Sequence, residues 1–390
     1  MATFSSSVHI LGAGPTGSLA AIALASKGYR VVLNDPQSRE ELLGRSRAYA
    51  ITHSSRRLLR DLKVWDGLQE SLIPFRSLDL RDSASGGRVM FDLDDLHPSN
   101  RRAEAIGWIL DHRPLMELLL DRLQDHHSVE MVLGSAAPQP EPDALIVAAD
   151  GPRSTTRSQW GIRCLQHRYR QGCLTSKVAL RGVSPGMAYE LFRPEGPLAI
   201  LPLGDGIFQV VWSAPWSRCQ RRADLSTPDF LDELATVLPG GIEPDLLLDS
   251  PRAFPQQWLL AKRLSRGRGV LLGEAGHRCH PVGGQGLNLC WRDVATLMNL
   301  AERGETPQGL ARRYGRKRWP DLLMVGLATD LLVRLFSNRQ LWLLPIRRLG
   351  LEAMARIGWL RSISLRAMSD GPTQFLSSWP DLTERECRPW

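Results

Sequence analysis

Residues 270–293, VLLGEAGHRCHPVGGQGLNLCWRD, carry the strongest indication of the fold. A three-residue apolar run from Val270 has the length of a short buried strand and stops at Gly273. Three more glycines follow at 283, 284 and 286, and we expect a helix from about Leu287. Glycine has no Cβ to hold a ligand off the backbone, and the first amides of a helix lack partners within it. The pattern predicts a strand, loop and helix that accept a flat ligand and stabilise negative charge on it.

A second glycine turn lies near the start of the chain. Residues 8–11 predict a short strand that runs into GAGPTG at 12–17, followed by an alanine-rich helix over residues 18–26. A second strand, residues 30–34, ends at Asp35, 18 positions after Gly17. This is close to the spacing of roughly 20 expected of a carboxylate that binds a ribose hydroxyl. The segment predicts a dinucleotide-binding βαβ unit, with contacts at Gly12, Gly14, Pro15, Thr16, Gly17 and Asp35.

The composition is that of a globular protein, with 43% hydrophobic and 23% charged residues. A chain of 390 residues exceeds one compact core and predicts two or three domains. We expect neither a signal peptide nor a membrane span, because no basic segment and apolar core precede the first strand and no uncharged apolar stretch reaches roughly 18 residues. Six cysteines without a CxxC pair favour reduced thiols, and hence a cytoplasmic protein.

The net charge of +8 is concentrated near the end of the chain. Residues 302–368 hold thirteen Lys or Arg and five Asp or Glu, a surplus equal to that of the whole chain. This region has amphipathic helical spacing and no module typical of base stacking, so a membrane surface is a better partner than nucleic acid. It predicts either a helical cap on the other domains or an interfacial anchor for a lipid-tailed substrate. The arginines set among its apolar residues are 334, 339, 347, 348, 356 and 361.

Three segments resemble the flavoprotein aromatic hydroxylases, the single-component FAD monooxygenases. They are GAGPTG with Asp35, AADGPR at 148–153, and GEAGHRCHPVGGQGLN at 273–288. Four further runs are similar to the ubiquinone-biosynthesis branch of that family, the 2-octaprenyl-6-methoxyphenol hydroxylase type. These runs are SRAYAIT at 46–52, KVWD at 63–66, AYELFRPEGPLAILPL at 188–203 and TDLLVRLFSNRQL at 329–341. The last two separate this branch from other hydroxylases on the same fold.

The resemblance implies bound FAD, with NAD(P)H as a transient co-substrate because only one dinucleotide fingerprint is present. It implies further FAD contacts at Arg47, Arg113, Asp150, Gly151, Gly273, Glu274, Gly286, Leu287 and Asn288. The backbone around Pro281, Gly283, Gly284 and Gln285 is implied to shape the space where oxygen reacts. The chain departs from the family at Glu274, where relatives have Asp, and at Cys290, where they have Gly. We expect FAD binding to survive both departures.

The predicted fold class is α/β: a three-layer Rossmann-like FAD-binding domain, an inserted mainly-β substrate domain and a C-terminal helical segment. Residues 78–91 predict a hairpin, and residues 163–268 predict a sheet with one helix at 227–237. Leu201, Pro202, Leu203 and Trp212 either face the flavin or belong to plain core. The expected boundaries are 1–75, 105–162 and 263–310 for the FAD domain, 76–104 and 163–262 for the substrate domain, and 311–390 for the helical region.

The HRCH run at 277–280 is not expected to bind a metal. A tight loop cannot turn two histidines and a cysteine toward one tetrahedral ion, and no second ligand pair is visible in the sequence. His277 is expected to pack the turn instead.

The resemblance implies hydroxylation of an aromatic ring, in which O2 reacts through a flavin C4a-hydroperoxide and the substrate is a polyprenylated phenol of quinone biosynthesis. The protein would be cytoplasmic, and peripheral on the membrane if the helical region is an anchor. Two alternatives stay open. One is another flavin reaction on the same fold, such as isoprenoid reduction, whereas a halogenase is disfavoured because no WxWxIP run occurs. The other is a low-turnover flavin-binding scaffold in a membrane-associated quinone-biosynthesis complex.

Overall fold

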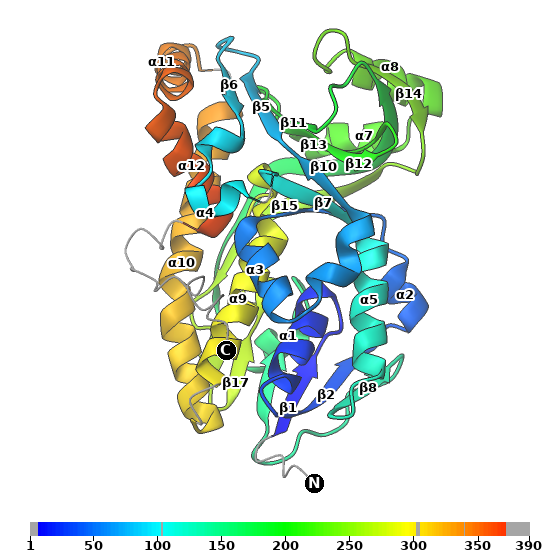
Figure 1. Ribbon diagram of the computed structural model, residues 1–390, viewed down its shortest axis with the longest axis vertical. Helices are drawn as coiled ribbons and strands as arrows, with labels where there is room; N and C mark the ends of the chain where they lie inside the picture. The colour runs from blue at the N-terminus through cyan, green and yellow to red at the C-terminus, as the bar shows by residue number, and fades with distance from the viewer. Residues whose placement is uncertain (1–6, 103, 302–304, 339, 372–390) are drawn as a thin grey trace, which may run out of the picture.

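A computed structural model describes residues 7–102, 104–301, 305–338 and 340–371, and Figure 1 shows it with a parallel sheet below and a larger sheet above. The lower sheet has six strands in the order β16-β17-β9-β1-β2-β8, of which all but the edge strand β16 run parallel. Its strands are β1 (Ser7–Leu11), β2 (Arg30–Asp35), β8 (Val129–Leu133), β9 (Leu145–Ala148), β16 (Ser265–Arg266) and β17 (Gly269–Leu271).

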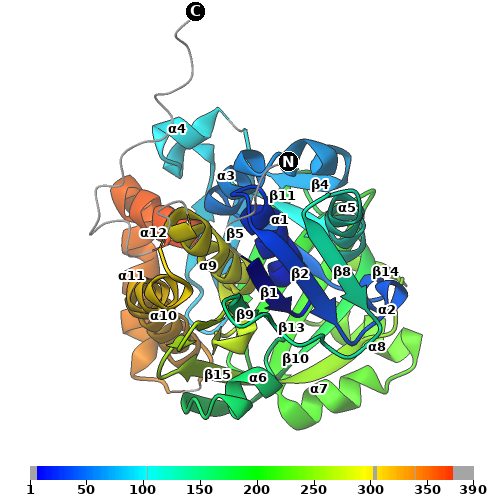
Figure 2. The ribbon, with the colours of Figure 1, turned by 90° about the horizontal axis from the view of Figure 1, so that it is seen from below.

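Three helices pack along one face of the parallel sheet, as seen from below in Figure 2. Helix α1 (Pro15–Ala25) lies in the middle, between α5 (His112–Gln124) and α9 (Gln285–Ala301). Most of α1 is buried, as expected of a helix that is apolar all round. It begins three residues earlier than predicted, with Pro15 at its first position. Proline is favoured there because the amide that it lacks would have no partner within the helix. Helix α9 likewise begins at Gln285 rather than Leu287.

The upper sheet has nine strands, eight of them in the order β18-β15-β10-β13-β12-β11-β5-β6, with β14 paired to β10. A small sheet in the order β3-β7-β4 contacts β12 from below. The nine strands are β5 (Ser77–Asp82), β6 (Arg88–Phe91), β10 (Cys164–Arg181), β11 (Met187–Phe192), β12 (Leu198–Gly204), β13 (Ile207–Pro215), β14 (Glu243–Leu247), β15 (Arg252–Ala261) and β18 (His277–Arg278). The small sheet consists of β3 (Ala48–Ile51), β4 (Leu72–Phe75) and β7 (Gly107–Asp111).

The hairpin expected over residues 78–91 is present as β5 and β6, which pair antiparallel. The sheet region has two helices where one was predicted: α8 (Thr227–Ala235) matches the prediction, and α7 (Trp216–Ala223) was missed. Helix α7 reads WSRCQRRA and buries only Cys219 and Arg222, so it has no apolar stripe that a periodicity search could find. The remaining helices are α2 (Arg39–Leu43), α3 (His53–Asp61), α4 (Pro98–Arg101) and α6 (Thr155–Gln159), with 3-10 turns at Trp65–Ser71, Leu93–Asp95, Gly273–Ala275 and Val282–Gly284.

The two faces of the upper sheet bury different cores. Along β11, Tyr189 and Leu191 pack into the cluster that α7 and α8 cover. Ala188 and Phe192 point the other way, into a cluster that includes Val282 and residues of the C-terminal helices. Because neighbouring side chains of a strand point to opposite faces, the second face, which we call the inner face, is turned toward the glycine loop.

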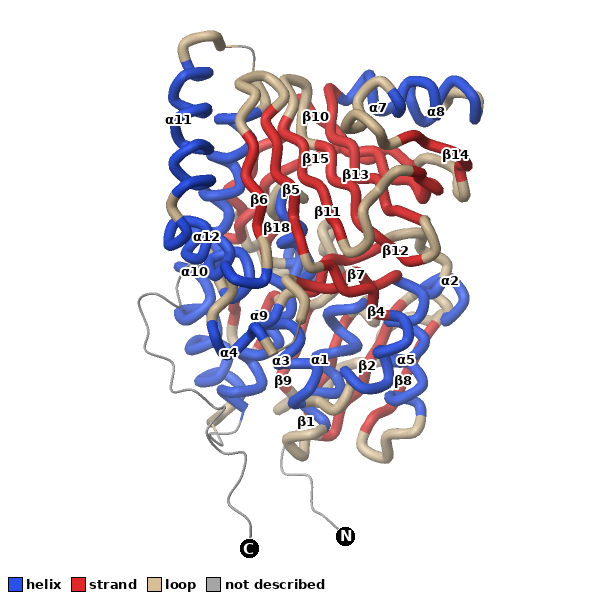
Figure 3. The backbone as a smooth tube through the Cα atoms, turned by 45° about the horizontal axis from the view of Figure 1, so that its top comes forward, coloured by secondary structure: helices blue, strands red, loops and turns tan. Residues whose placement is uncertain are grey.

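The C-terminal helices run up one side of the molecule (Figure 3). They are α10 (Pro307–Phe336), α11 (Leu343–Arg356) and α12 (Gly358–Asp370). No helix among the described residues is both long and apolar enough to cross a membrane.

The arginines of this region are less free than the sequence suggested. Arg347 is fully buried and its Nε donates to Asp82 of β5 at 3.0 Å. Arg361, Arg334 and Arg348 pair with Asp95, Asp330 and Glu352 at 2.7–2.9 Å. Arg339 lies outside the described residues. Four of these arginines are therefore paired within the fold, two of them with acids outside the helical region, which periodicity alone could not reveal.

Candidate cofactor and active site

The two glycine turns predicted from opposite ends of the chain are in contact. Gly273 has a φ of +62°, and a Cβ on it would lie 3.0 Å from Cγ2 of Thr16 and 3.2 Å from Sγ of Cys290. The Trp291 indole donates to the carbonyl of Pro15 at 3.2 Å. The Cys290 thiol is buried and lies with Thr16 against Gly273, so it fills space between the turns. The departure from glycine at Cys290 is thus accommodated by packing.

The third segment of the resemblance, residues 148–153, meets the first glycine turn at Gly12. Its φ is +106°, and a Cβ there would come within 2.4 Å of the Ala149 carbonyl oxygen and 2.9 Å of the Asp150 nitrogen. A Cβ on Gly17 would lie 1.8 Å from the carbonyl oxygen of Gly12. Real Cβ atoms do not approach backbone this closely, so both positions require glycine. The fold therefore places Asp150 directly beside the first turn.

Asp35 is fixed at the end of β2. Its Oδ2 accepts from the amide of Ala13 at 2.7 Å and its Oδ1 from the amide of Gln37 at 2.9 Å. A carboxylate has four lone-pair sites. These two bonds therefore orient the group and leave acceptor capacity for a ligand hydroxyl.

Arg47 lies near the second glycine turn. Desolvation acts to lower the pKa of Arg47, but Tyr49, Glu274 and two buried thiols outweigh it and the pKa is raised. Its guanidinium lies 5.4 Å from the centre of the Tyr49 ring. The structure does not bring Arg113 to this group: its Nε pairs with Glu117 at 2.8 Å and its side chain is 65% exposed. The neighbouring His112 is the buried residue at this helix start, bonded to Leu42 and Tyr49.

The loop before α9 is held by the side chains of Gln285 and Asn288. Gln285 donates to the carbonyls of Gly283 at 3.1 Å and Met368 at 3.0 Å, which ties the loop to α12. Asn288 donates to Ala50 and Gly284, and its oxygen accepts from Thr52 and Ser55. Because the fold uses the whole Asn288 amide, this side chain clamps α9 to β3 and α3, and only backbone groups remain for a ligand.

Asp293 anchors the second glycine turn from inside α9. Its Oδ2 accepts from the Gly273 amide at 2.8 Å and from His277 at 2.7 Å, and its Oδ1 accepts from Arg318 at 2.7 Å. Burial acts to raise the pKa of Asp293, but His277 and Arg318 outweigh it and lower the pKa to about 2. His277 thus packs the turn, and within the described ranges no group of three or more His, Cys, Asp or Glu could hold a metal ion.

Comparison with known sequences agrees with this geometry. The FAD binding domain family matches residues 5–106 and 121–322. The chain belongs to this FAD-binding family. It is 32% identical to ubiquinone hydroxylase UbiL of Rhodospirillum rubrum over 92% of this chain and 88% of the relative. It is 28% identical to 3-demethoxyubiquinol 3-hydroxylase of Escherichia coli over 92% and 97%. The resemblance to the ubiquinone-biosynthesis branch of FAD-dependent aromatic hydroxylases is confirmed.

The fold is also shared with a solved structure that contains FAD. Klebsiella pneumoniae HpxO, solved with FAD and uric acid, superposes with a TM-score of 0.73 over 94% of this chain and 96% of that one, at 19% identity. The α/β fold class, the FAD cofactor and the enzyme class predicted from the sequence are confirmed.

The residues around the three turns fit FAD. Oδ2 of Asp150 accepts from the Thr156 amide at 3.0 Å, whereas its Oδ1 is buried and has no partner. A buried, unpaired carboxylate oxygen is costly, and a ligand hydroxyl of the kind that FAD carries would satisfy it. A Cβ on Gly14, Gly151 or Gly286 would meet nothing within 4 Å. The three turns therefore leave backbone open to a ligand between them.

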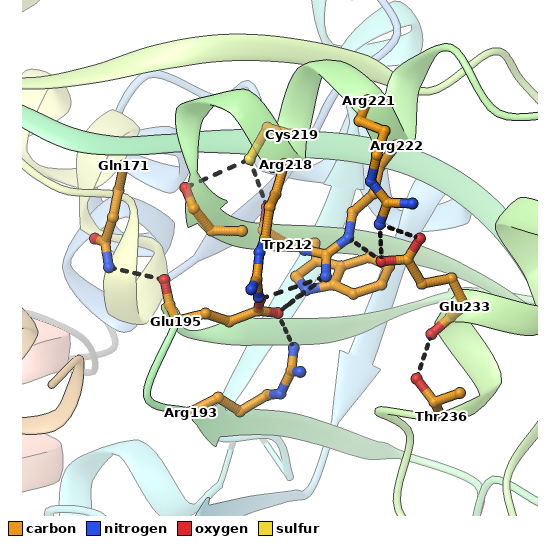
Figure 4. A network of polar contacts seen from close by, with 11 residues as sticks. Gln171, Arg193, Glu195, Trp212, Arg218, Cys219, Arg221, Arg222, Glu233 and Thr236 are labelled. Carbon is orange, nitrogen blue, oxygen red and sulfur yellow. Dashed lines mark hydrogen bonds and ion pairs between the residues drawn. The ribbon is translucent and has the colours of Figure 1, made fainter. Parts of the chain in front are cut away.

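Trp212 does not line this site. It is fully buried in the core on the opposite face of the upper sheet, which α7 and α8 cover, and Arg222 lies 3.8 Å from the centre of its ring. Figure 4 shows Glu195 accepting hydrogen bonds from Trp212, Arg218 and Arg222 and forming an ion pair with Arg193. Leu201 and Leu203, by contrast, belong to the inner-face cluster. Strand alternation separates these residues, but the sequence alone does not reveal which face is turned toward the cofactor.

Sequence reasoning missed three residues that the site depends on: Asp293, Trp291 and Glu190. Glu190 of β11 is buried on the inner face, and its carboxyl interacts with the backbone of Gly283. A charged residue inside an apolar strand or helix is the signal that could have singled out Asp293 and Glu190.

We predict that Asp150→Asn weakens FAD binding by about 10- to 100-fold, because a hydrogen bond to a charged group contributes about 1.5–3 kcal/mol. The amide keeps an acceptor for Thr156 but turns a donor toward the ligand hydroxyl. Titration of apoprotein by flavin fluorescence measures this, with the exposed Asp125→Asn as the matched control. Equal affinity in Asp150→Asn and the wild type would remove Asp150 from the FAD site.

Proposed function

We propose that this protein hydroxylates the aromatic ring of a prenylated phenol in quinone biosynthesis, using FAD, NAD(P)H and O2. The observation that carries the proposal is the meeting of the three FAD segments beside the inner face of a separate sheet. Relatives named for ubiquinone hydroxylation over nearly the whole chain support it. We further propose residues 76–104 and 163–262 as the substrate domain.

When bound, FAD accepts a hydride from NAD(P)H and activates O2 for transfer to the ring. The chain supplies position and electrostatics. The first amides of α9 at Gly286 and Leu287 would stabilise negative charge on the reduced ring. Pro281 and the backbone of Gly283 and Gly284 would bound the reacting space and exclude water from it. Gln285 contributes by fixing that loop to α12.

The inner face suits a substrate that is mainly hydrocarbon. Beside the loop it presents apolar side chains from four elements: Leu78 and Leu80 of β5, Phe192 of β11, Leu201 and Leu203 of β12, and Phe336 of α10. Burying each CH2 group of a ligand contributes about 0.8 kcal/mol. A prenylated ring is favoured over a charged one here because none of these side chains could pair with a charged group.

We expect purified protein with FAD, NAD(P)H and a short-chain 2-prenylphenol to add one oxygen atom to the ring. Mass spectrometry in 18O2 should show the label in the product. A product that is reduced in its prenyl chain and unlabelled would instead establish the isoprenoid-reductase alternative. NAD(P)H oxidation that yields only hydrogen peroxide with a series of prenylated phenols would contradict the proposal.

We also propose that the protein works at the cytoplasmic membrane surface, where such a substrate resides. Large apolar side chains are exposed on α10, α11 and the segment between them. Leu341 is 79% exposed, Leu349 69%, Trp342 67% and Leu331 64%. Exposed Trp and Leu near a helix end are typical of interfacial insertion. Because most arginines there are paired within the fold, apolar insertion should contribute more than attraction to anionic lipid.

The protein should float with anionic liposomes and stay bound when salt is raised, because screening weakens charge attraction but not apolar insertion. The double variant Leu341→Asp, Trp342→Asp should lose binding. Leu246→Asp with Leu248→Asp, which removes two exposed leucines from the other side of the molecule, is the matched control and should bind normally. A wild-type protein that stays in the soluble fraction at low salt would refute the membrane proposal.

A further inference from the structure

Glu190 is an isolated carboxyl in an apolar row. Along β11 it shares the inner face with Ala188 and Phe192. Across the sheet it stands opposite Leu80 of β5 and Ala199 of β12. Residues directly opposite in neighbouring strands share a face. Four apolar side chains thus surround the carboxyl within the sheet, and a buried carboxyl in such a place requires a reason.

The carboxyl faces the loop that bounds the reacting space. The Gly283 backbone interacts with it and acts to lower its pKa, and Val282 packs against the same apolar cluster. Gly283 has a φ of +69°. Glu190 is therefore a buried acidic side chain of the upper sheet that lies against the glycine loop.

The surroundings of Glu190 allow both the protonated and the ionised carboxyl near neutral pH. Burial raises the pKa of Glu190 to about 7, and the Gly283 amide acts in the opposite direction. Among the charged groups on the elements packed against this face, Asp82 pairs with Arg347, Asp330 with Arg334 and Asp95 with Arg361, whereas Nε of Arg366 on α12 is buried without a hydrogen-bond partner. His280, just before the loop, is neutral at pH 7 because burial lowers its pKa to about 3.

We propose that Glu190 is the proton acceptor for the phenolic hydroxyl of the substrate. The inference rests on the proposed function and deepens it by assigning the group that activates the ring. In the step, the phenol O–H bond breaks and its proton bonds to a carboxylate oxygen of Glu190. The electron pair stays on the phenol oxygen and spreads into the ring, which makes the ring carbons more nucleophilic toward oxygen. When the ring is hydroxylated, the ring carbon that gains the hydroxyl group loses its hydrogen as a proton to water, and Glu190 returns its own proton to the substrate oxygen.

The competing explanation is that Glu190 only pins the glycine loop to the sheet. Glu190→Gln separates the two, because its amide oxygen still accepts from the Gly283 amide but the side chain cannot ionise. A pinning role predicts a normal Gln variant and a damaged Ala variant. Proton transfer predicts that both variants are impaired.

Two measurements test the proposal, each with the exposed Glu130→Gln as control. With a 2-prenylphenol, kcat/KM of the wild type should rise with pH through about 7 as Glu190 ionises. Glu190→Gln should lose that limb and fall in kcat by roughly 10²–10⁴-fold. Independently of turnover, phenol binding measured by calorimetry in two buffers at pH 7 should exchange protons in the wild type and none in Glu190→Gln.

The outcomes distinguish this inference from the function beneath it. If the wild type hydroxylates the phenol and Glu190→Gln keeps both the rate and the pH limb, Glu190 is a pin and the inference is overturned. Phenol binding to the wild type without any proton exchange overturns it as well. If the wild type neither binds nor hydroxylates the prenylphenols, the proposed function fails and the inference falls with it.

Discussion

The structure depends on the contact between two glycine turns that are about 260 residues apart in sequence. Gly273 sits against Thr16 with no room for a side chain, and Gly12 sits against the peptide of Ala149 and Asp150 in the same way. These contacts bring the ends of β1, β9 and β17 to one edge of the parallel sheet. A ligand that lies along that edge meets backbone from all three segments, which is the arrangement expected at the carboxyl ends of parallel strands.

The contact is maintained by buried charge. Asp293 holds the Gly273 amide from within α9, and Arg318 of α10 balances the carboxylate. Helix α10 therefore helps to fix the second glycine turn, so it is packed into the fold and is not only a surface segment. Arg347 of α11 likewise forms a buried pair with Asp82 and so holds α11 to β5. Removing one partner of such a buried pair typically costs about 3–5 kcal/mol, so the helical region is part of the folded core as well as a candidate membrane surface.

The sequence revealed the cofactor domain well because its signals are local. A strand, a glycine turn, a helix and an acid occur in a fixed order at residues 8–35, and the backbone at Gly12 and Gly17 admits no alternative. The contacts that could not be read from the sequence depend on distant partners. Arg113 faces solvent because its neighbour His112 takes the buried position, and Asn288 is consumed by contacts with β3 and α3. Glu190 could not be connected to Gly283 before the sheet was folded over the loop.

The central claim is that one FAD lies across both turns, and Gly14 and Gly286 test it most directly. A Cβ on either residue meets nothing within 4 Å in the protein, so valine there should fold normally but project into the ligand. The measurement is FAD bound per apoprotein chain for Gly14→Val and Gly286→Val, with Gly240→Val as an equally open control. The account predicts one FAD per chain for the wild type and control, and none for either test variant at the same concentrations. Full FAD binding by both folded variants would contradict it.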